Sequence, residues 1–328
     1  MDLRLALYDT AARHQLDAAD TARLELSAGL AAPPTHLLRK TVLTLAALAA
    51  SLIGLGLVFW VAAHWDTLGR LGRFALLQGT VLVMVVGAWA RPAARGPLSL
   101  LALLATGALF AYFGQTYQTG ADAWQLFALW AALTLPLALG QRSDLLWAPW
   151  ALLAMTAVAL WVQTYTGHSW RAAPHDLAAH AVGWVLALAV VLLLSPPLQR
   201  HTSAGEWALR TALSLAVVMI SSSALGGLFQ SSVAGHYGLG LLVLAVLAAL
   251  LSRPAGFDIF GLSAVALGLN ALLFGGLARL LFDNSGDDPI GRLLLLGVAA
   301  AAMLGGTVAL ILRLSRERAA AAVEGGAS

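Results

Sequence analysis

The sequence contains no cysteine and very little charge. Without cysteine there are no disulfide bonds, no thiolate metal sites and no cysteine nucleophile. Asp, Glu, Lys and Arg together make up 11% of the 328 residues, against about 25% in an ordinary soluble domain. That is too little polar surface to cover a water-soluble fold of this size, and the same composition excludes a disordered chain.

Lysine is almost absent, because eighteen Arg and a single Lys supply all the basic side chains. The formal net charge is only +3 and no basic run occurs, so we expect no nucleic-acid partner. A cleavable signal peptide is not expected either, since about forty fairly polar residues precede the first apolar run near Val42. That run would act as an uncleaved signal anchor.

Long apolar runs dominate the rest of the chain, which is 60% hydrophobic with a mean hydropathy of +0.81. A helix needs about 20 apolar residues to cross a hydrocarbon core of about 30 Å. Ten segments meet this approximately: 42–63, 74–90, 98–114, 124–140, 145–163, 177–195, 207–227, 237–252, 257–280 and 290–312. They lack the alternation of barrel strands. The predicted fold class is therefore an all-α polytopic integral membrane bundle of about ten transmembrane helices with short loops.

Three regions follow from these spans: a cytoplasmic helical N-tail over 1–40, a transmembrane bundle over 41–313 and a flexible cytoplasmic C-tail over 314–328. Two short helices are predicted in the N-tail, the second capped by Asp17 with Asp20 three residues later. With the N-terminus inside, fourteen basic residues fall on inner segments and five on outer loops. The positive-inside rule therefore places both termini in the cytoplasm.

The predicted spans have no clear mid-membrane charge, which argues against a carboxylate-driven antiporter and a voltage sensor. Transport of a neutral or lipid-like molecule stays open. Polar side chains do occur inside spans, and we select Gln78, Ser222 and Asn270 as a possible pathway. The alternative for the two amides is interhelical hydrogen bonding, worth about 1 kcal/mol each. Near Ser222 the Ser- and Gly-rich segment 221–232 predicts either a half-helix lining a cavity or a helix that ends near Gly226.

Metal and catalytic patterns are weak. His175, Asp176 and His180 are ligand types, but zinc needs three or four converging ligands, and His64, His168 or His236 could complete a site only through a tertiary contact. A polar helix start is the simpler interpretation, so we expect no metal and no cofactor. The sequence has no GxSxG pattern and no phosphate loop, and no catalytic residue is assigned. An interfacial enzyme that uses Asp66, Asp122 or His180 as acid or base is the third hypothesis.

Two motifs are more specific. The first is aromatic-Val-Ala-Ala-X-Trp-Asp at residues 60–66, and the second is Phe-Gly-Gln-X-Tyr-Gln at residues 113–118. With them, residues 10–165 resemble the bacterial multi-pass membrane-protein family catalogued as domain of unknown function 2157. The family usually has Asn where this chain has His64.

The resemblance implies a multi-pass protein of the bacterial cytoplasmic (inner) membrane and supplies no activity. Members are often encoded beside another multi-pass protein and a small envelope protein, which implies work in an envelope membrane complex. The partners would be the lipid bilayer and other envelope membrane proteins. The positions that match or adjoin the motifs would form a contact surface on the outer face: Trp65, Asp66, Gln115, Tyr117, Gln118, Asp122 and Trp124.

Two functions are therefore predicted. The leading one is a non-enzymatic membrane component that assembles with envelope partners through these outer loops. The alternative is a carrier or flippase for a neutral, amphipathic or lipid-linked molecule. In either case small residues would allow close helix packing, and we expect this at Gly54, Gly56, Gly268, Gly275, Gly305 and Gly306.

Overall fold

The computed structural model describes residues 3–28, 35–64, 67, 69–117, 120–167, 172–253, 257–283 and 289–325. The first two helices, α1 (Leu3–Arg13) and α2 (Ala18–Ser27), are the two predicted in the N-tail. The carboxylate of Asp17 accepts a hydrogen bond from the backbone N–H of Asp20 at 2.7 Å, which confirms the predicted cap. Tyr8 Oη donates to Glu25 Oε1 at 2.7 Å and joins the two helices.

Every predicted span coincides with a helix, and the described residues include no strand. The helices are α3 (Thr35–Ala63), α4 (Arg70–Ala90), α5 (Arg95–Tyr117), α6 (Ala123–Gln141), α7 (Asp144–Tyr165), α8 (Leu177–Leu194), α10 (Glu206–Leu228), α11 (Gly235–Leu251), α12 (Ile259–Asp283) and α13 (Pro289–Gly325). Short turns, η1 (Pro92–Ala94), η2 (Pro174–Asp176), η3 (Pro196–Leu198) and α9 (Gln199–Thr202), connect some of them.

Nine helices of the described chain are long and apolar enough to cross a membrane. The tenth, α11, has 17 residues and spans about 25 Å at 1.5 Å per residue. The predicted all-α polytopic bundle is thereby confirmed. The helix α13 also continues without a break through residues 314–325, the stretch that the sequence assigns to the C-tail.

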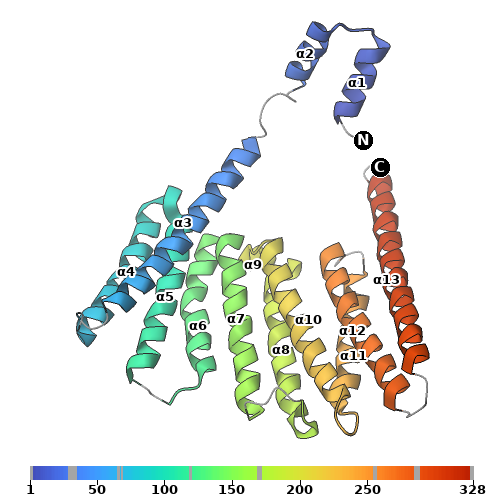
Figure 1. Ribbon diagram of the computed structural model, residues 1–328. Helices are drawn as coiled ribbons and strands as arrows, with labels where there is room; N and C mark the ends of the chain where they lie inside the picture. Colours follow the sequence, from blue (N-terminus) through green and yellow to red (C-terminus); the bar gives the residue numbers. More distant parts are fainter. Residues whose placement is uncertain are drawn as a thin grey trace.

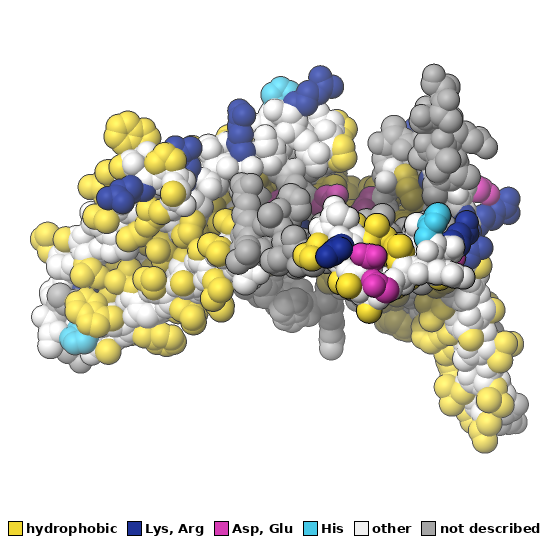
Figure 2. Space-filling view, turned by 90° about the horizontal axis from the view of Figure 1, so that it is seen from above, with side chains coloured by type: hydrophobic (Ala, Val, Ile, Leu, Met, Phe, Trp, Pro, Cys, Tyr) yellow, Lys and Arg dark blue, Asp and Glu magenta, His cyan; other side chains and the backbone are white. Residues whose placement is uncertain are grey.

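The spans stand side by side in a row and alternate in direction (Figure 1). Helices α3, α5, α7, α10 and α12 end on one side, which we name the predicted outer face. The start of α3 and the end of α13 lie on the opposite side, the predicted inner face. Figure 2 looks onto that inner face and shows Lys and Arg side chains on it, with hydrophobic side chains along the flanks.

Alanines bring the central helices together. Ala208, Ala212 and Ala216 repeat every four residues along α10, and all three are fully buried. Helix α10 packs against both α7 and α8. In lipid there is little hydrophobic gain from helix association, so short side chains matter because they let backbones approach and pack closely.

Glycine packing follows the prediction at three of the six positions. A Cβ on Gly54 would lie 3.1 Å from Leu104, one on Gly268 2.7 Å from Val217, and one on Gly275 2.6 Å from Leu225. The prediction is wrong for Gly56, Gly305 and Gly306, which have nothing within 4 Å among the described residues. Those three lie on exposed faces of α3 and α13, the two least buried spans.

Helix α13 is joined to the bundle by polar contacts. Asn270 Nδ2 on α12 donates to Thr307 Oγ1 on α13 at 3.0 Å, and the Thr307 hydroxyl donates back to Asn270 Oδ1 at 3.2 Å. Near the predicted inner face, Arg318 Nη2 donates to the carbonyl of Ser252 at 3.0 Å. For Asn270, interhelical hydrogen bonding is the role that the structure shows.

The start of α10 receives its cap from another helix. Asp144, the first residue of α7, accepts from the backbone N–H of Gly205 at 2.6 Å and from that of Trp207 at 3.0 Å. One turn later Arg210 forms ion pairs with Glu206 at 2.9 Å and with Asp258 at 3.6 Å. These contacts hold α7, α10 and the start of α12 together at the predicted inner face.

Candidate functional site

The structure describes four of the seven residues of the predicted contact surface. Trp65, Asp66 and Gln118 lie outside the described residues. Gln115 and Tyr117 are exposed at the end of α5. Asp122 is the N-cap residue of α6, although its side chain makes no capping hydrogen bond, and Trp124 follows in the first turn, partly buried. The four described members therefore lie around one helix connection at the predicted outer face.

Aromatic rings cover the same end of α4 and α5. The ring of Tyr117 lies 4.9 Å from that of Phe113 and 5.7 Å from that of Phe74 on α4, measured between centroids. Tyr112 is buried below them with its ring 4.7 Å from Phe74. Aromatic rings at this depth are typical of the membrane interface. Tyr117 nevertheless stays 52% exposed, so it is free to contact another molecule.

The three predicted pathway residues do not converge. Gln78 is exposed on α4, a helix that packs mainly against α5. Asn270 is bonded to Thr307 between α12 and α13. Ser222 is exposed on α10, and among the three it alone lines the pocket described next.

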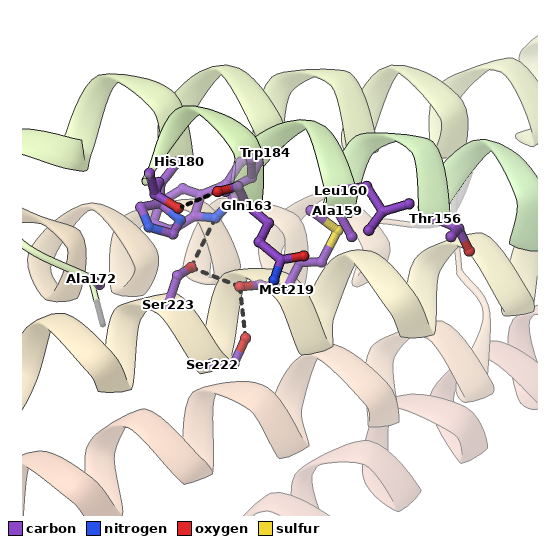
Figure 3. A pocket seen from close by; sticks show the side chains of 12 residues that line it. Thr156, Ala159, Leu160, Gln163, Ala172, His180, Trp184, Met219, Ser222 and Ser223 are labelled. Atoms are coloured by element: carbon purple, nitrogen blue, oxygen red, sulfur yellow. Dashed lines mark hydrogen bonds between the residues drawn. The ribbon is translucent and has the colours of Figure 1, made fainter. Parts of the chain in front are cut away.

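A pocket of about 340 Å³ lies between α7, α8 and α10 (Figure 3). The lining consists of Thr156, Ala159, Leu160, Val162, Gln163, Thr166, Ala172, His180, Trp184, Met219, Ser222 and Ser223. No Asp, Glu, Lys or Arg belongs to this lining. Helix α10 is continuous through Gly226 and Gly227 to Leu228 beside the pocket, so a cavity forms here without an unwound half-helix.

Polarity changes along the pocket. His180 and Ser223 lie at one end with Gln163 next to them, Ala159 and Leu160 lie farther along, and Thr156 lies at the other end (Figure 3). The polar end is near the last turn of α7 and the start of α8, at the predicted outer face. Thr156 precedes the end of α7 at Tyr165 by nine residues, or about 13 Å. The pocket thus extends from the interface toward the middle of the membrane.

Most hydroxyl groups at the polar end already donate hydrogen bonds to backbone carbonyls. Ser222 Oγ and Ser223 Oγ donate to the carbonyl of Met219 at 3.2 and 2.7 Å, and Thr166 Oγ1 donates to the carbonyl of Gln163 at 3.2 Å. Trp184 Nε1 donates to Ser223 Oγ at 3.1 Å. His180 differs, because its Nε2 is buried and has no hydrogen-bond partner within the described structure.

A second histidine stands behind His180. The ring of His236, at the start of α11, lies 4.9 Å from that of His180 at an interplanar angle of 81° and is fully buried. His175 is exposed and pairs with buried Asp176 at 3.4 Å. Only folding brings His236 to His180. Even so, the described residues contain no group of three His, Cys, Asp or Glu side chains that could hold a metal ion.

The polar end is covered by a chain of contacts. Gln230 Nε2, after α10, donates to the carbonyl of Ala172 at 3.2 Å. Arg279 Nη1 on α12 donates to the carbonyl of Gln230 at 2.9 Å, and its Nε pairs with Asp283 at 2.9 Å. A neighbouring pocket of about 420 Å³ contains this Arg279–Asp283 pair. Arg279 and Asp283 already pair with each other, so we assign no ligand to this second pocket.

Comparison with protein families concerns the first part of this structure. Residues 10–147 match a family model described as "Predicted membrane protein (DUF2157)". The match confirms the resemblance inferred from the motifs at residues 60–66 and 113–118, and it supports a multi-pass membrane protein. It covers less than half of the chain. No curated protein and no solved structure matches the chain.

The boundary of the match separates the two candidate sites. The described contact residues around α5 and α6 lie inside residues 10–147, whereas every residue that lines the pocket lies after them. Sequence reasoning found Ser222 and noted His180, but it missed Gln163 as a site residue. Gln163-Thr164-Tyr165 repeats Gln115-Thr116-Tyr117 48 residues earlier, and each triplet ends a helix, α7 and α5. That repeat was the sequence feature that could have pointed to Gln163.

Proposed function

We propose that the protein is a non-enzymatic integral membrane protein that binds a neutral amphipathic molecule between α7, α8 and α10. This develops the carrier or flippase function predicted as the alternative. One observation supports it above all: an uncharged pocket has most of its polar groups near the membrane interface and, apart from Thr156, apolar residues toward the bilayer centre. An amphiphile in a bilayer has the same orientation.

The chemistry of the lining limits the ligand. A charged head group buried here would have no opposite charge to pair with, which is costly at low dielectric. A neutral head group needs only hydrogen bonds. Ala159 and Ser222 are exposed on membrane-spanning helices, so the pocket opens sideways. Access from the lipid phase suits a ligand that is already dissolved in the membrane.

Photolabelling tests this proposal. The purified protein in lipid nanodiscs is irradiated with a long-chain alcohol bearing a diazirine, and labelled peptides are mapped by mass spectrometry. We expect labelling near Leu160 and Met219. Ala159→Phe places a ring at the opening and is expected to lower this labelling about tenfold, because the ring takes volume that the probe would occupy; tenfold weaker binding corresponds to about 1.4 kcal/mol. Val185→Phe is the control, because Val185 is exposed on α8 and does not line the pocket.

Equal labelling of all lipid-facing helices, unchanged in Ala159→Phe, would mean bulk lipid contact and would contradict the proposal.

We propose a second role, assembly with envelope partners through the outer-face residues of the matched segment. Exposed Gln115 and Tyr117 beside the aromatic rings of α4 and α5 favour it. In this proposal Trp65, Asp66, Gln118, Asp122 and Trp124 complete the surface. The protein would lie in the bacterial inner membrane with both termini cytoplasmic, as the excess of basic residues on inner segments favours.

Crosslinking in native membranes followed by affinity purification tests the second role. We expect a stoichiometric partner whose recovery falls several-fold in Tyr117→Ala, because truncating an exposed aromatic contact weakens an interface. Tyr165→Ala is the matched control: Tyr165 ends α7 in the same Gln-Thr-Tyr triplet and is 59% exposed. Equal losses in both variants, or no partner at all, would count against this role.

A further inference from the structure

Buried histidine nitrogens without a hydrogen-bond partner are the starting point. In the described part of the chain these include His180 Nε2 and both ring nitrogens of His236, and of the two residues only His180 lines the pocket. Buried polar groups in folded proteins are nearly always hydrogen-bonded. A group supplied by a ligand in the pocket would satisfy the His180 nitrogen.

The neighbours of His180 define which head group fits. Ser222, Ser223 and Thr166 have given their hydroxyl hydrogens to backbone carbonyls, so toward the pocket they offer oxygen lone pairs. A carboxylate, which only accepts, would face these oxygen lone pairs, and the lining contains no Lys or Arg to offset its charge. A hydroxyl both donates and accepts: it can accept from a protonated Nε2 while donating to a serine oxygen, and in the other tautomer it can donate its single hydrogen to Nε2.

The orientation of His180 is supported from behind. The ring of His236 packs edge-on against it at 4.9 Å. His236 is in turn held close to α10, because a Cβ on Gly227 would lie only 2.7 Å from the His236 Cβ. Helix α11 therefore positions the ring that faces the pocket, although α11 contributes nothing to the pocket lining.

Size limits what the pocket can enclose. The volume of about 340 Å³ is at the low end of small-molecule pockets, which range over about 300–1,000 Å³. This volume suits one hydrocarbon chain, and a second chain would have to remain in the lipid outside the opening.

We propose that the pocket binds a single-chain lipid alcohol whose hydroxyl forms a hydrogen bond with Nε2 of His180. This inference rests on the proposed amphiphile-binding function and names its ligand class. His180 is the residue that determines specificity for the head group, and His236 is a positioning residue.

Competition among ligands of equal chain length tests the inference. The diazirine alcohol is the photoprobe, and the competitors are the unlabelled alcohol, the alkane and the fatty acid. We expect the alcohol to displace the probe at a concentration about tenfold lower than the other two, because a site that bonds a hydroxyl rejects analogues that lack it. In His180→Leu the alcohol is expected to lose this advantage while the alkane competes as before.

Control variants separate the head-group contact from a general disturbance. His175→Leu should leave the alcohol preference intact, since the His175 side chain is 82% exposed and outside the pocket lining. Melting temperatures of the variants report folding. If His180→Leu does not fold, the competition series on the wild type decides alone.

The outcomes distinguish the two proposals. Pocket labelling that all three competitors displace equally would overturn the alcohol inference and leave amphiphile binding in place. A fatty acid preferred over the alcohol would also overturn it. Absence of pocket labelling in the wild type would overturn both proposals together.

Discussion

Replacing Asp144 by alanine is expected to lower the free energy of unfolding by about 2 kcal/mol. Its carboxylate accepts from the backbone N–H groups of Gly205 and Trp207 at the start of α10. Loss of a helix cap costs about 0.5–2 kcal/mol, and hydrogen bonds to charged groups are worth about 1.5–3 kcal/mol. Because α10 supplies Met219, Ser222 and Ser223 to the pocket, ligand binding should weaken as well.

Asp122→Ala is the matched control for this variant. Asp122 is also an aspartate at a helix N-terminus, but its side chain makes no capping hydrogen bond to α6. Unfolding in mixed detergent micelles, followed by circular dichroism, should show a clear loss for Asp144→Ala and little change for Asp122→Ala. Similar stability in both variants would mean that the cap across helices contributes nothing.

Replacing Gly107 by alanine is expected to destabilise the protein by about 2 kcal/mol. A Cβ at Gly107 would fall within contact of the Trp130 ring on α6, closer than atoms can approach. The ring cannot simply move, because Trp130 Nε1 donates to the carbonyl of Leu103 on α5 at 2.9 Å. Overpacking of this kind costs about 1–3 kcal/mol.

Gly56→Ala is the matched control for this variant, and it should not destabilise the protein. Gly56 is also a glycine within a span, but nothing among the described residues lies within 4 Å of its position for a Cβ. Alanine is the better helix former by about 1 kcal/mol, so this variant should be neutral or slightly more stable. The same unfolding measurement applies to both glycines. A stable Gly107→Ala protein would show that α5 and α6 tolerate a wider separation.

Features that depend on a single short segment, such as a helical span or a helix cap, were predictable from the sequence. Each span must satisfy its own backbone hydrogen bonds in lipid, so ten apolar runs become ten helices wherever they pack. Asp17 caps α2 because the carboxylate and the N–H of Asp20 are only three residues apart. Neither outcome depends on knowing which helices are neighbours.

Helix pairing was not predictable in this way. Helix α3 packs against α5, although α4 follows it in sequence. Gly54 therefore meets Leu104, while Gly56 two residues later faces outward. Both glycines look alike in the sequence, because a helix of apolar residues shows no face that must point inward when lipid is as apolar as the core.

The sequence by itself determined the membrane class, the helical spans, the N-tail helices and the resemblance of the first part of the chain to a known family, which the family model matches over residues 10–147. Only the tertiary structure decided which polar residues meet. Asn270 became a bond between helices, whereas Ser222 joined Gln163 and His180 at a pocket. The physical reason is distance along the chain: α7, α8 and α10 contribute side chains many residues apart to the pocket, and their convergence depends on helix packing that apolar composition does not encode.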